Sequence, residues 1–202
     1  MALRRPSPGI DPSLWDEIRS VLTKLYVILD TETTGLLAPE MVSVAVIDPE
    51  GRTLVDDIVR PAKPIEPDAQ RITGLTKDVV ADKPEFPSVE PQLTSVLTGQ
   101  CVIIYNAAYD VSVLQNTYDR YGLLLPQFET WCAMEWFARV YGEWNERRRS
   151  YTWQSLAKAA AYFEVPQENA HNALGDCLTT WNVLQAALQR AGFRMNGMDP
   201  LL

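Results

Sequence analysis

Residues 26–36, YVILDTETTGL, are the segment most informative about the fold. It begins like a buried strand and runs directly into Asp30 and Glu32, where neutral turn residues would be usual. Side chains two residues apart in an extended chain leave the same face, so these two carboxylates lie close together and repel each other. A divalent cation relieves this repulsion, and Mg²⁺ or Mn²⁺ suits all-carboxylate ligation better than zinc.

The Asp-x-Glu spacing alone is weak evidence, because the chain repeats it at Asp48 and Glu50. The second pair stands in the sequence DPEG, which is typical of a turn. We expect its carboxylates to be solvated there, without a ligand. The position at the end of a strand is what sets the first pair apart.

The composition indicates a single domain. The chain has 202 residues, of which 47% are hydrophobic, enough for one substantial core. No apolar run approaches the roughly 20 residues that cross a bilayer. The N-terminal sequence MALRRPSPGIDPS lacks the apolar segment of a secretory signal. We therefore expect a cytoplasmic protein without a membrane partner, in which the three widely spaced cysteines are buried free thiols.

Hydrophobic patterns predict an α/β fold with a mixed sheet. We expect strands at 25–30, 41–48, 52–60 and 101–105. We expect helices at 14–25, 88–97, 108–121, 131–141, 152–162 and 172–190. The second and third strands are joined by a turn and are therefore antiparallel neighbours. The proline-rich stretch at 60–90 is expected to be a stiff loop with short helical turns.

Two further carboxylates have settings that suit a metal site. Asp110 begins the helix that follows the strand at 101–105, although a helix N-terminus also stabilises a carboxylate without any ligand. Asp176 lies in the last helix, outside the apolar stripe that we expect to face the core. That stripe comprises Leu174, Cys177, Leu178, Trp181, Leu184 and Leu188, and leaves Asp176 on the side of Asn172, Ala173 and Thr180.

The only histidine, His171, stands at the start of the same helix. A lone histidine is more often a helix cap or a surface residue than a catalyst. The net charge of −8 argues against nucleic-acid binding by bulk electrostatics, but an acidic enzyme can still bind phosphodiesters through divalent cations.

Taken in order, three segments of the chain resemble the motifs of the DnaQ-like family, the histidine subtype of the DEDD superfamily of 3′-to-5′ exonucleases. The segments are DTETTG at 30–35, YNAAYD at 105–110 and HNALGD at 171–176. The tyrosine subtype would carry a tyrosine where this chain has Asn172. RPAKPIEPDAQRITGLT at 60–76 is also similar to the family, and WCAMEWFARVY at 131–141 is most similar to exonuclease-X-like members. Tyr105 and Thr73 depart from the pattern, since many relatives have histidine at both places.

The resemblance implies an RNase H-like mixed sheet, with three antiparallel strands followed by parallel strands and flanked by helices. It implies that four carboxylates hold two Mg²⁺ or Mn²⁺ ions around the scissile phosphate, and that His171 is the general base. Those carboxylates are Asp30, Glu32, Asp110 and Asp176. It further implies that the terminal nucleotide contacts Thr33, Leu36, Thr73 and Asn106. On this likeness, 1–24 is an N-terminal extension with an amphipathic helix, 25–191 is the exonuclease domain and 192–202 is a short tail.

The resemblance leaves several functions to be weighed. The expected function is removal of 5′-mononucleotides from the 3′ end of DNA, with single-stranded DNA favoured. The alternatives are an exoribonuclease of the same family, a proofreading exonuclease bound to a polymerase, and a binding module without activity. The sequence DCLTTW lacks the charged run usual in oligoribonucleases, which favours DNA. The short tail implies no stable polymerase partner, and the presence of all five catalytic residues argues against an inactive module.

The densest basic run is Arg147, Arg148 and Arg149, with Trp144 and Tyr151 on either side. Such a run is a candidate for contacting phosphates and stacking a base. The pattern favours the simpler alternative, a solvated loop that precedes the helix at 152–162.

Overall fold

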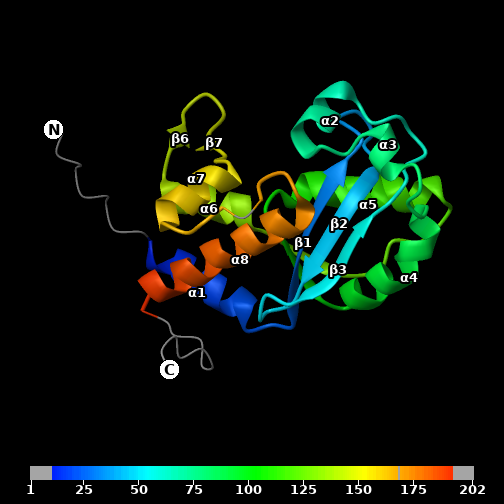
Figure 1. Cartoon of the computed structure of the whole chain (residues 1–202). Helices are drawn as coiled ribbons and strands as arrows, with labels where there is room; N and C mark the ends of the chain where they lie inside the picture. The colour runs from blue at the N-terminus through cyan, green and yellow to red at the C-terminus, as the bar shows by residue number, and fades with distance from the viewer. Residues whose placement is uncertain (1–10, 168, 193–202) are drawn as a thin grey trace.

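A five-stranded mixed sheet of order β3-β2-β1-β4-β5 forms the centre of the molecule (Figure 1). The computed structural model describes residues 11–167 and 169–192, so most of the predicted tail and the start of the extension lie outside the described residues. The β1–β2 and β2–β3 pairs are antiparallel, whereas β1–β4 and β4–β5 are parallel. The strands are β1 (Tyr26–Thr33), β2 (Met41–Ile47), β3 (Thr53–Ile58), β4 (Cys101–Ile104) and β5 (Glu129–Cys132). The predicted α/β class and strand directions are confirmed.

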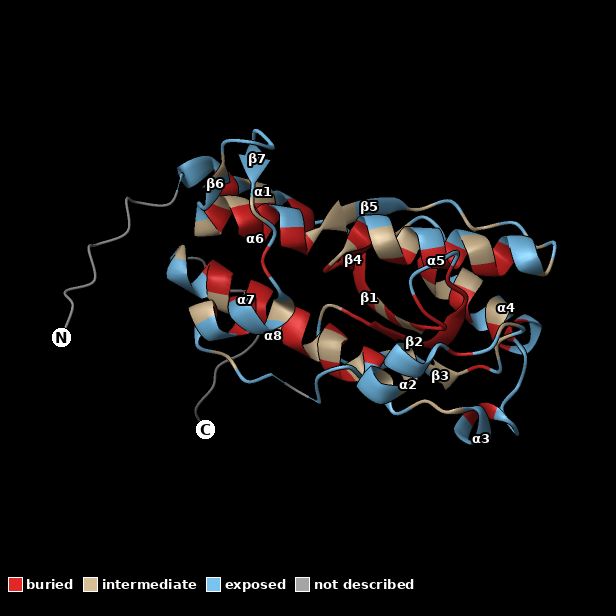
Figure 2. Ribbon diagram, turned by 90° about the horizontal axis from the view of Figure 1, so that it is seen from above, coloured by how far each residue is buried: buried red, intermediate tan, exposed pale blue. Residues whose placement is uncertain are grey.

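Helices cover both faces of this sheet (Figure 2). They are α1 (Pro12–Leu22), α2 (Pro67–Thr73), α3 (Lys77–Val80), α4 (Phe86–Leu97), α5 (Ala107–Arg120), α6 (Ala133–Tyr141), α7 (Leu156–Phe163) and α8 (Ala173–Arg190). One hydrophobic core joins the sheet to α1, α6, α7 and α8, and a second joins its other face to α4 and α5. No helix in the described part of the chain is long and apolar enough to cross a membrane.

Successive side chains of β1 point to opposite faces of the sheet, and this alternation determines which residues lie on each face. Tyr26 and Ile28 belong to the core beneath α8, whereas Val27 and Leu29 belong to the core beneath α5. Continuing this alternation directs Asp30 and Glu32 to the side of α8, and Thr31 to the side of α5. The strand thus supplies carboxylates to the helix that carries Asp176.

Helix α1 belongs to the larger core although it precedes the sheet in sequence. Asp11 caps the helix by accepting a hydrogen bond from the backbone N–H of Ser13 at 2.9 Å. The Arg139 guanidinium donates two hydrogen bonds, of 2.7 and 2.8 Å, to the carboxylate of Glu17. The Trp136 indole N–H donates to the backbone carbonyl of Leu14 at 3.0 Å. The residues of α1 buried in the core are Leu14, Ile18, Val21 and Leu22.

Three parts of the fold differ from the sequence prediction. Residues 131–132, expected to begin a helix, end the edge strand β5, so α6 starts at Ala133. The stretch expected to be a loop forms a hairpin of β6 (Trp144–Asn145) and β7 (Ser150–Tyr151), and α7 starts only at Leu156, after the N-cap Ser155. Cys132 is only partly buried, because β5 lies at the sheet edge; Cys101 and Cys177 are buried, and all three are free thiols.

Helix α8 is also buried differently from the predicted stripe. Ala173 and Thr180, expected on the side away from the core, are fully buried because α8 lies across β1 and β2. Leu174, Leu178 and Trp181 are only partly buried. Helix α8 therefore contacts the sheet over a wider part of its surface than the apolar stripe predicts.

Candidate active site

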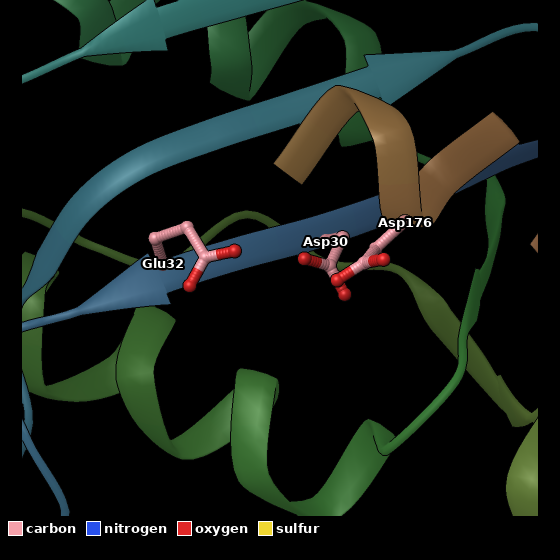
Figure 3. Close-up of side chains that lie close together, drawn as sticks. All are labelled: Asp30, Glu32 and Asp176. Atoms are coloured by element: carbon pink, nitrogen blue, oxygen red, sulfur yellow. The ribbon is translucent and has the colours of Figure 1, made fainter. Parts of the chain in front are cut away.

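Three carboxylates from two elements meet at the end of β1 (Figure 3). Asp30 and Glu32 project from β1, and Asp176 projects toward them from the first turn of α8. One oxygen atom from each of the three side chains lies within 4.8 Å of the other two. Oxygen atoms at this spacing suit a hard divalent cation.

The fourth predicted carboxylate, Asp110, lies beside this group but not within it. It stands in the first turn of α5, a helix that packs on the other face of the sheet. One of its oxygens accepts hydrogen bonds from the hydroxyl of Thr31 at 2.7 Å and from the backbone N–H of Thr31 at 3.2 Å. Asp110 is nevertheless close enough for its charge to raise the pKa of Asp30.

Burial raises the pKa of every carboxyl group in the site, and repulsion from neighbouring carboxylates adds to the shift at Asp30, Glu32 and Asp110. Burial, followed by the charges of the neighbouring carboxylates, raises the pKa of Asp30 well above its ordinary value and that of Glu32 to about 7. Burial raises the pKa of Asp110 to about 6 although Thr31 donates to it, and burial also raises the pKa of Asp176. One oxygen of Asp176, Oδ1, is buried without a hydrogen-bond partner. The charged form of this group therefore requires a counter-charge.

His171 lies immediately before α8 with an exposed side chain and a backbone φ of 63°, in the left-handed region that non-glycine residues rarely adopt. Its backbone N–H donates to Oδ2 of Asp176 at 3.3 Å. The N-cap of α8 is Asn172, whose Oδ1 accepts from the N–H of Gly175 at 3.1 Å. Asn172 therefore caps α8, and the side chain of His171 does not take part in capping and is exposed.

A pocket of about 420 Å³ opens next to the carboxylates, between the end of β1 and α2. Glu32 lines it, so the pocket and the carboxylate group are continuous. The four residues expected to contact a terminal nucleotide all line this pocket: Thr33, Leu36, Thr73 and Asn106. Leu36 is 84% exposed and supplies an apolar edge that faces solvent.

Several residues of this pocket were not predicted from the sequence, among them Tyr109 and Glu66. The hydroxyl of Tyr109 lies 2.8 Å from the hydroxyl of Thr33 and donates to the backbone carbonyl of Gly35, also at 2.8 Å. The side chain of Glu66 packs so closely on Gly35 that a Cβ at position 35 would collide with it. The position of Tyr109 next to Asp110 was a usable signal, because the first turn of α5 faces the end of β1. Nothing in the sequence marked Glu66.

Comparisons with known proteins identify an exonuclease family. The sequence model of the RNase_T family, described as an exonuclease, matches residues 27–184. An uncharacterized exonuclease, CP81, of Escherichia phage 186 is 34% identical over 168 residues, which cover 79% of this chain and 86% of that protein. The PolC-type DNA polymerase III of Lacticaseibacillus paracasei is 26% identical over 191 residues, but the match covers only 13% of its length.

A solved structure also matches the fold. Exonuclease X in complex with 5′ overhanging duplex DNA superposes with a TM-score of 0.63 and 26% sequence identity, and the match covers 84% of this chain and 95% of that one. This likeness confirms the RNase H-like fold.

Proposed function

This chain belongs to the RNase_T family of exonucleases and is a DnaQ-like hydrolytic nuclease, and we propose that it removes 5′-mononucleotides from the 3′ end of DNA. The observation that carries the proposal is the group of three carboxylates, with oxygens within 4.8 Å, beside a pocket of about 420 Å³. Such a pocket is large enough for one nucleotide and presents both apolar and polar side chains to it. The complex of exonuclease X with duplex DNA supports DNA as the substrate class.

The donor set fits two Mg²⁺ or Mn²⁺ ions. Asp30, Glu32 and Asp176 would hold them together with Asp110, and the unpartnered Oδ1 of Asp176 is an oxygen in need of a counter-charge. Hard divalent cations at such a site activate water and stabilise charge on the scissile phosphate and on the leaving 3′-oxygen. Burial of four carboxylates without them is unfavourable, as the raised pKa values of Asp30, Glu32, Asp110 and Asp176 indicate.

Other residues of the site would act as the general base and would bind the terminal nucleotide. His171 takes the proton from the attacking water, since its side chain is exposed beside Asp176 and histidine changes charge near neutral pH. Thr33, positioned by Tyr109, lies where the 3′-terminal sugar would sit against Glu32. Leu36 and Thr73 border the place of the terminal base.

The direct test uses three substrates of one sequence with a 5′ label: single-stranded DNA, duplex DNA and RNA. Each is incubated with the protein in Mg²⁺, in Mn²⁺ and in EDTA, and products are separated by size. We expect a ladder that shortens from the 3′ end on single-stranded DNA, no reaction in EDTA, and 5′-mononucleotides as products. Faster degradation of RNA would reassign the substrate to the exoribonuclease class.

A second pair of substrates tests the direction. A 3′-phosphate should block the reaction, because the pocket beside Glu32 would receive the terminal hydroxyl. A 5′-phosphate should have no effect. Equal cleavage of both substrates would point to an endonuclease and contradict the proposal.

A further inference from the structure

The tip of the β6–β7 hairpin concentrates positive charge that the protein does not neutralise. Residues 147–149 are three exposed arginines in a four-residue turn. Within residues 11–167 and 169–192, none of the three forms an ion pair. Six other arginines do lie within 4.0 Å of a carboxylate: Arg19, Arg52, Arg60, Arg71, Arg120 and Arg139. In a chain of net charge −8, three adjacent unpaired arginines are an exception.

Exposed aromatic side chains stand directly below this tip. Trp144 and Tyr151 are cross-strand partners, and their rings meet edge to face with centroids 5.2 Å apart. They are 48% and 38% exposed, and Trp153, two residues further along, is 63% exposed. None of the three belongs to a hydrophobic core of the described residues. Exposed aromatic rings beside arginines are the elements of a stacking platform for single-stranded nucleic acid.

The hairpin is held in place rather than loosely attached. Within the turn, Oδ1 of Asn145 accepts a hydrogen bond from the backbone N–H of Arg148 at 2.9 Å. At the base, the N–H of Thr152 donates to the carbonyl of Glu143 at 2.7 Å. The side chain of Gln154 donates to the carboxylate of Glu143 at 3.3 Å. The segment is therefore a hydrogen-bonded hairpin, and the arginines at its tip are solvent-exposed, as the sequence predicted.

A buried hydrogen bond connects the base of the hairpin to the active site. The hydroxyl of Tyr105, at the end of β4, donates to the backbone carbonyl of Gln154 at 3.0 Å, and Tyr105 is only 7% exposed. The next residue, Asn106, lines the nucleotide pocket. Tyr105 therefore links the pocket to the hairpin. Figure 1 shows the hairpin standing clear of the sheet, above α6 and α7.

We propose that the β6–β7 hairpin is a second contact site for the substrate strand, which binds nucleotides upstream of the 3′ end while that end occupies the pocket. The inference rests on the proposed function, since it assigns the hairpin to the same DNA strand. The arginines contact phosphates, and Trp144 and Trp153 stack on bases. Three phosphate contacts on a single strand change the slope of log K against log salt by about 2, which corresponds to about 100-fold in affinity at 0.1 M salt.

The test compares two triple variants that remove the same number of positive charges. The first acts at the hairpin tip: Arg147→Gln, Arg148→Gln and Arg149→Gln. The matched control acts in surface ion pairs away from the pocket: Arg19→Gln, Lys24→Gln and Arg52→Gln. Binding of a fluorescent 20-nucleotide oligothymidylate is measured by anisotropy in EDTA over a range of salt concentrations. Cleavage is measured on the same strand and on the p-nitrophenyl ester of thymidine 5′-monophosphate, which is too short to reach the hairpin.

We expect the hairpin variant to bind the 20-mer 10- to 100-fold more weakly, with a salt slope lower by about 2. Its KM for the strand rises, its kcat is nearly unchanged, and its cleavage of the ester equals that of the parent. The control retains the parent's affinity and slope. Equal affinity of the parent and the hairpin variant, or an equal loss in the control, would overturn the inference. Failure of the proposed function is distinct, because the parent itself would then cleave neither the strand nor the ester.

A single substitution tests the stacking part of the inference. Replacing Trp144 with Leu keeps an apolar side chain and removes the aromatic face. We expect affinity for the 20-mer to fall about 5-fold or more, with an unchanged salt slope and unchanged cleavage of the ester. Retention of the parent's affinity would show that Trp144 does not contact a base and would overturn its part in the site.

Discussion

Two Asp-x-Glu pairs with the same spacing meet opposite environments in this fold. The carboxylate of Asp48 accepts the backbone N–H groups of Glu50 and Arg52 at 3.0 and 2.9 Å, and the Arg52 guanidinium at 2.6 Å. It is 7% exposed, so the expectation that this pair is merely solvated was wrong for Asp48. The carboxylates of Asp30 and Glu32 accept no hydrogen bond from the described residues and face Asp176 instead.

The difference teaches that the environment, and not the spacing, distinguishes a structural carboxylate pair from a ligand-binding pair. The turn around Asp48 satisfies its charge locally and completely. At the end of β1 several carboxylates lie close together without compensating positive charge within the described part of the chain. This arrangement is favourable only when a cation binds. The four experiments that follow test this contrast.

The largest effect is expected at Asp30. Replacing Asp30 with Asn removes one metal ligand, and the loss of several kcal/mol of transition-state stabilisation lowers kcat by about 10⁴-fold. Asp48→Asn is the matched control and should leave kcat unchanged. Calorimetric titration with Mn²⁺ should show weaker binding only in Asp30→Asn. Unchanged Mn²⁺ affinity in that variant would contradict the assignment of the carboxylate group.

A smaller effect is expected at His171. His171→Ala should lower kcat by roughly 10² to 10⁴ through loss of the general base, while Mn²⁺ affinity survives. Asn172→Ala removes the actual helix cap and serves as the control, with a loss of about 1 kcal/mol in stability. If modification of His171 by diethyl pyrocarbonate goes to completion and activity remains, His171 is not the base.

The pH dependence of stability should separate the two carboxylate pairs. In the folded protein the pKa of Glu32 is about 7 and that of Asp110 about 6, both above their unfolded values. A raised carboxyl pKa means that ionisation opposes folding, so the free energy of unfolding of the metal-free protein should fall between about pH 4 and pH 7, by several kcal/mol. Urea titrations across this range measure it, and Mn²⁺ should abolish the fall. A rise in stability over this range would mean that the site carboxylates are already compensated.

The smallest effect is expected at the second pair. Asp48→Asn removes the charged hydrogen bond to Arg52 but retains one acceptor, so it should cost about 1 kcal/mol of stability. Asp30→Asn should instead leave the metal-free protein equally or more stable, since it relieves repulsion. Thermal unfolding in EDTA compares the two variants. If Asp48→Asn and Asp30→Asn destabilise the protein to a similar extent, the two carboxylate pairs do not differ in the way proposed.

Regular patterns in the sequence predicted most of the fold. The apolar runs of β1, β2 and β4 and the periodicity of α5 and α8 were found, because buried elements carry strong hydrophobic patterns. Strand β5 was missed because it has only four residues, lies at the sheet edge and runs directly into α6. The β6–β7 hairpin was missed because both strands have two exposed or half-exposed residues and its turn lacks the usual Asn-Gly or Asp-Gly signal.

The sequence named residues that the structure brings together at the end of β1 and in the adjacent pocket, but it did not give their arrangement. The sequence named the three grouped carboxylates, and it named the four pocket residues through the family likeness. It did not predict that Asp110 would turn toward Thr31, because that contact depends on how α5 packs against β1. It did not predict Tyr109 or Glu66, which join the pocket through tertiary contacts between distant parts of the chain.

The packing of α1 has a consequence for where the folding unit starts. The family match begins at residue 27, yet Leu14, Ile18, Val21 and Leu22 are buried against the domain. Burying four such side chains contributes roughly 6 kcal/mol or more, which is comparable to the whole net stability of a typical domain. A fragment trimmed to the family boundary would expose Trp136 and leave Arg139 without Glu17. Recombinant expression of an active domain should therefore start no later than residue 11, the helix cap.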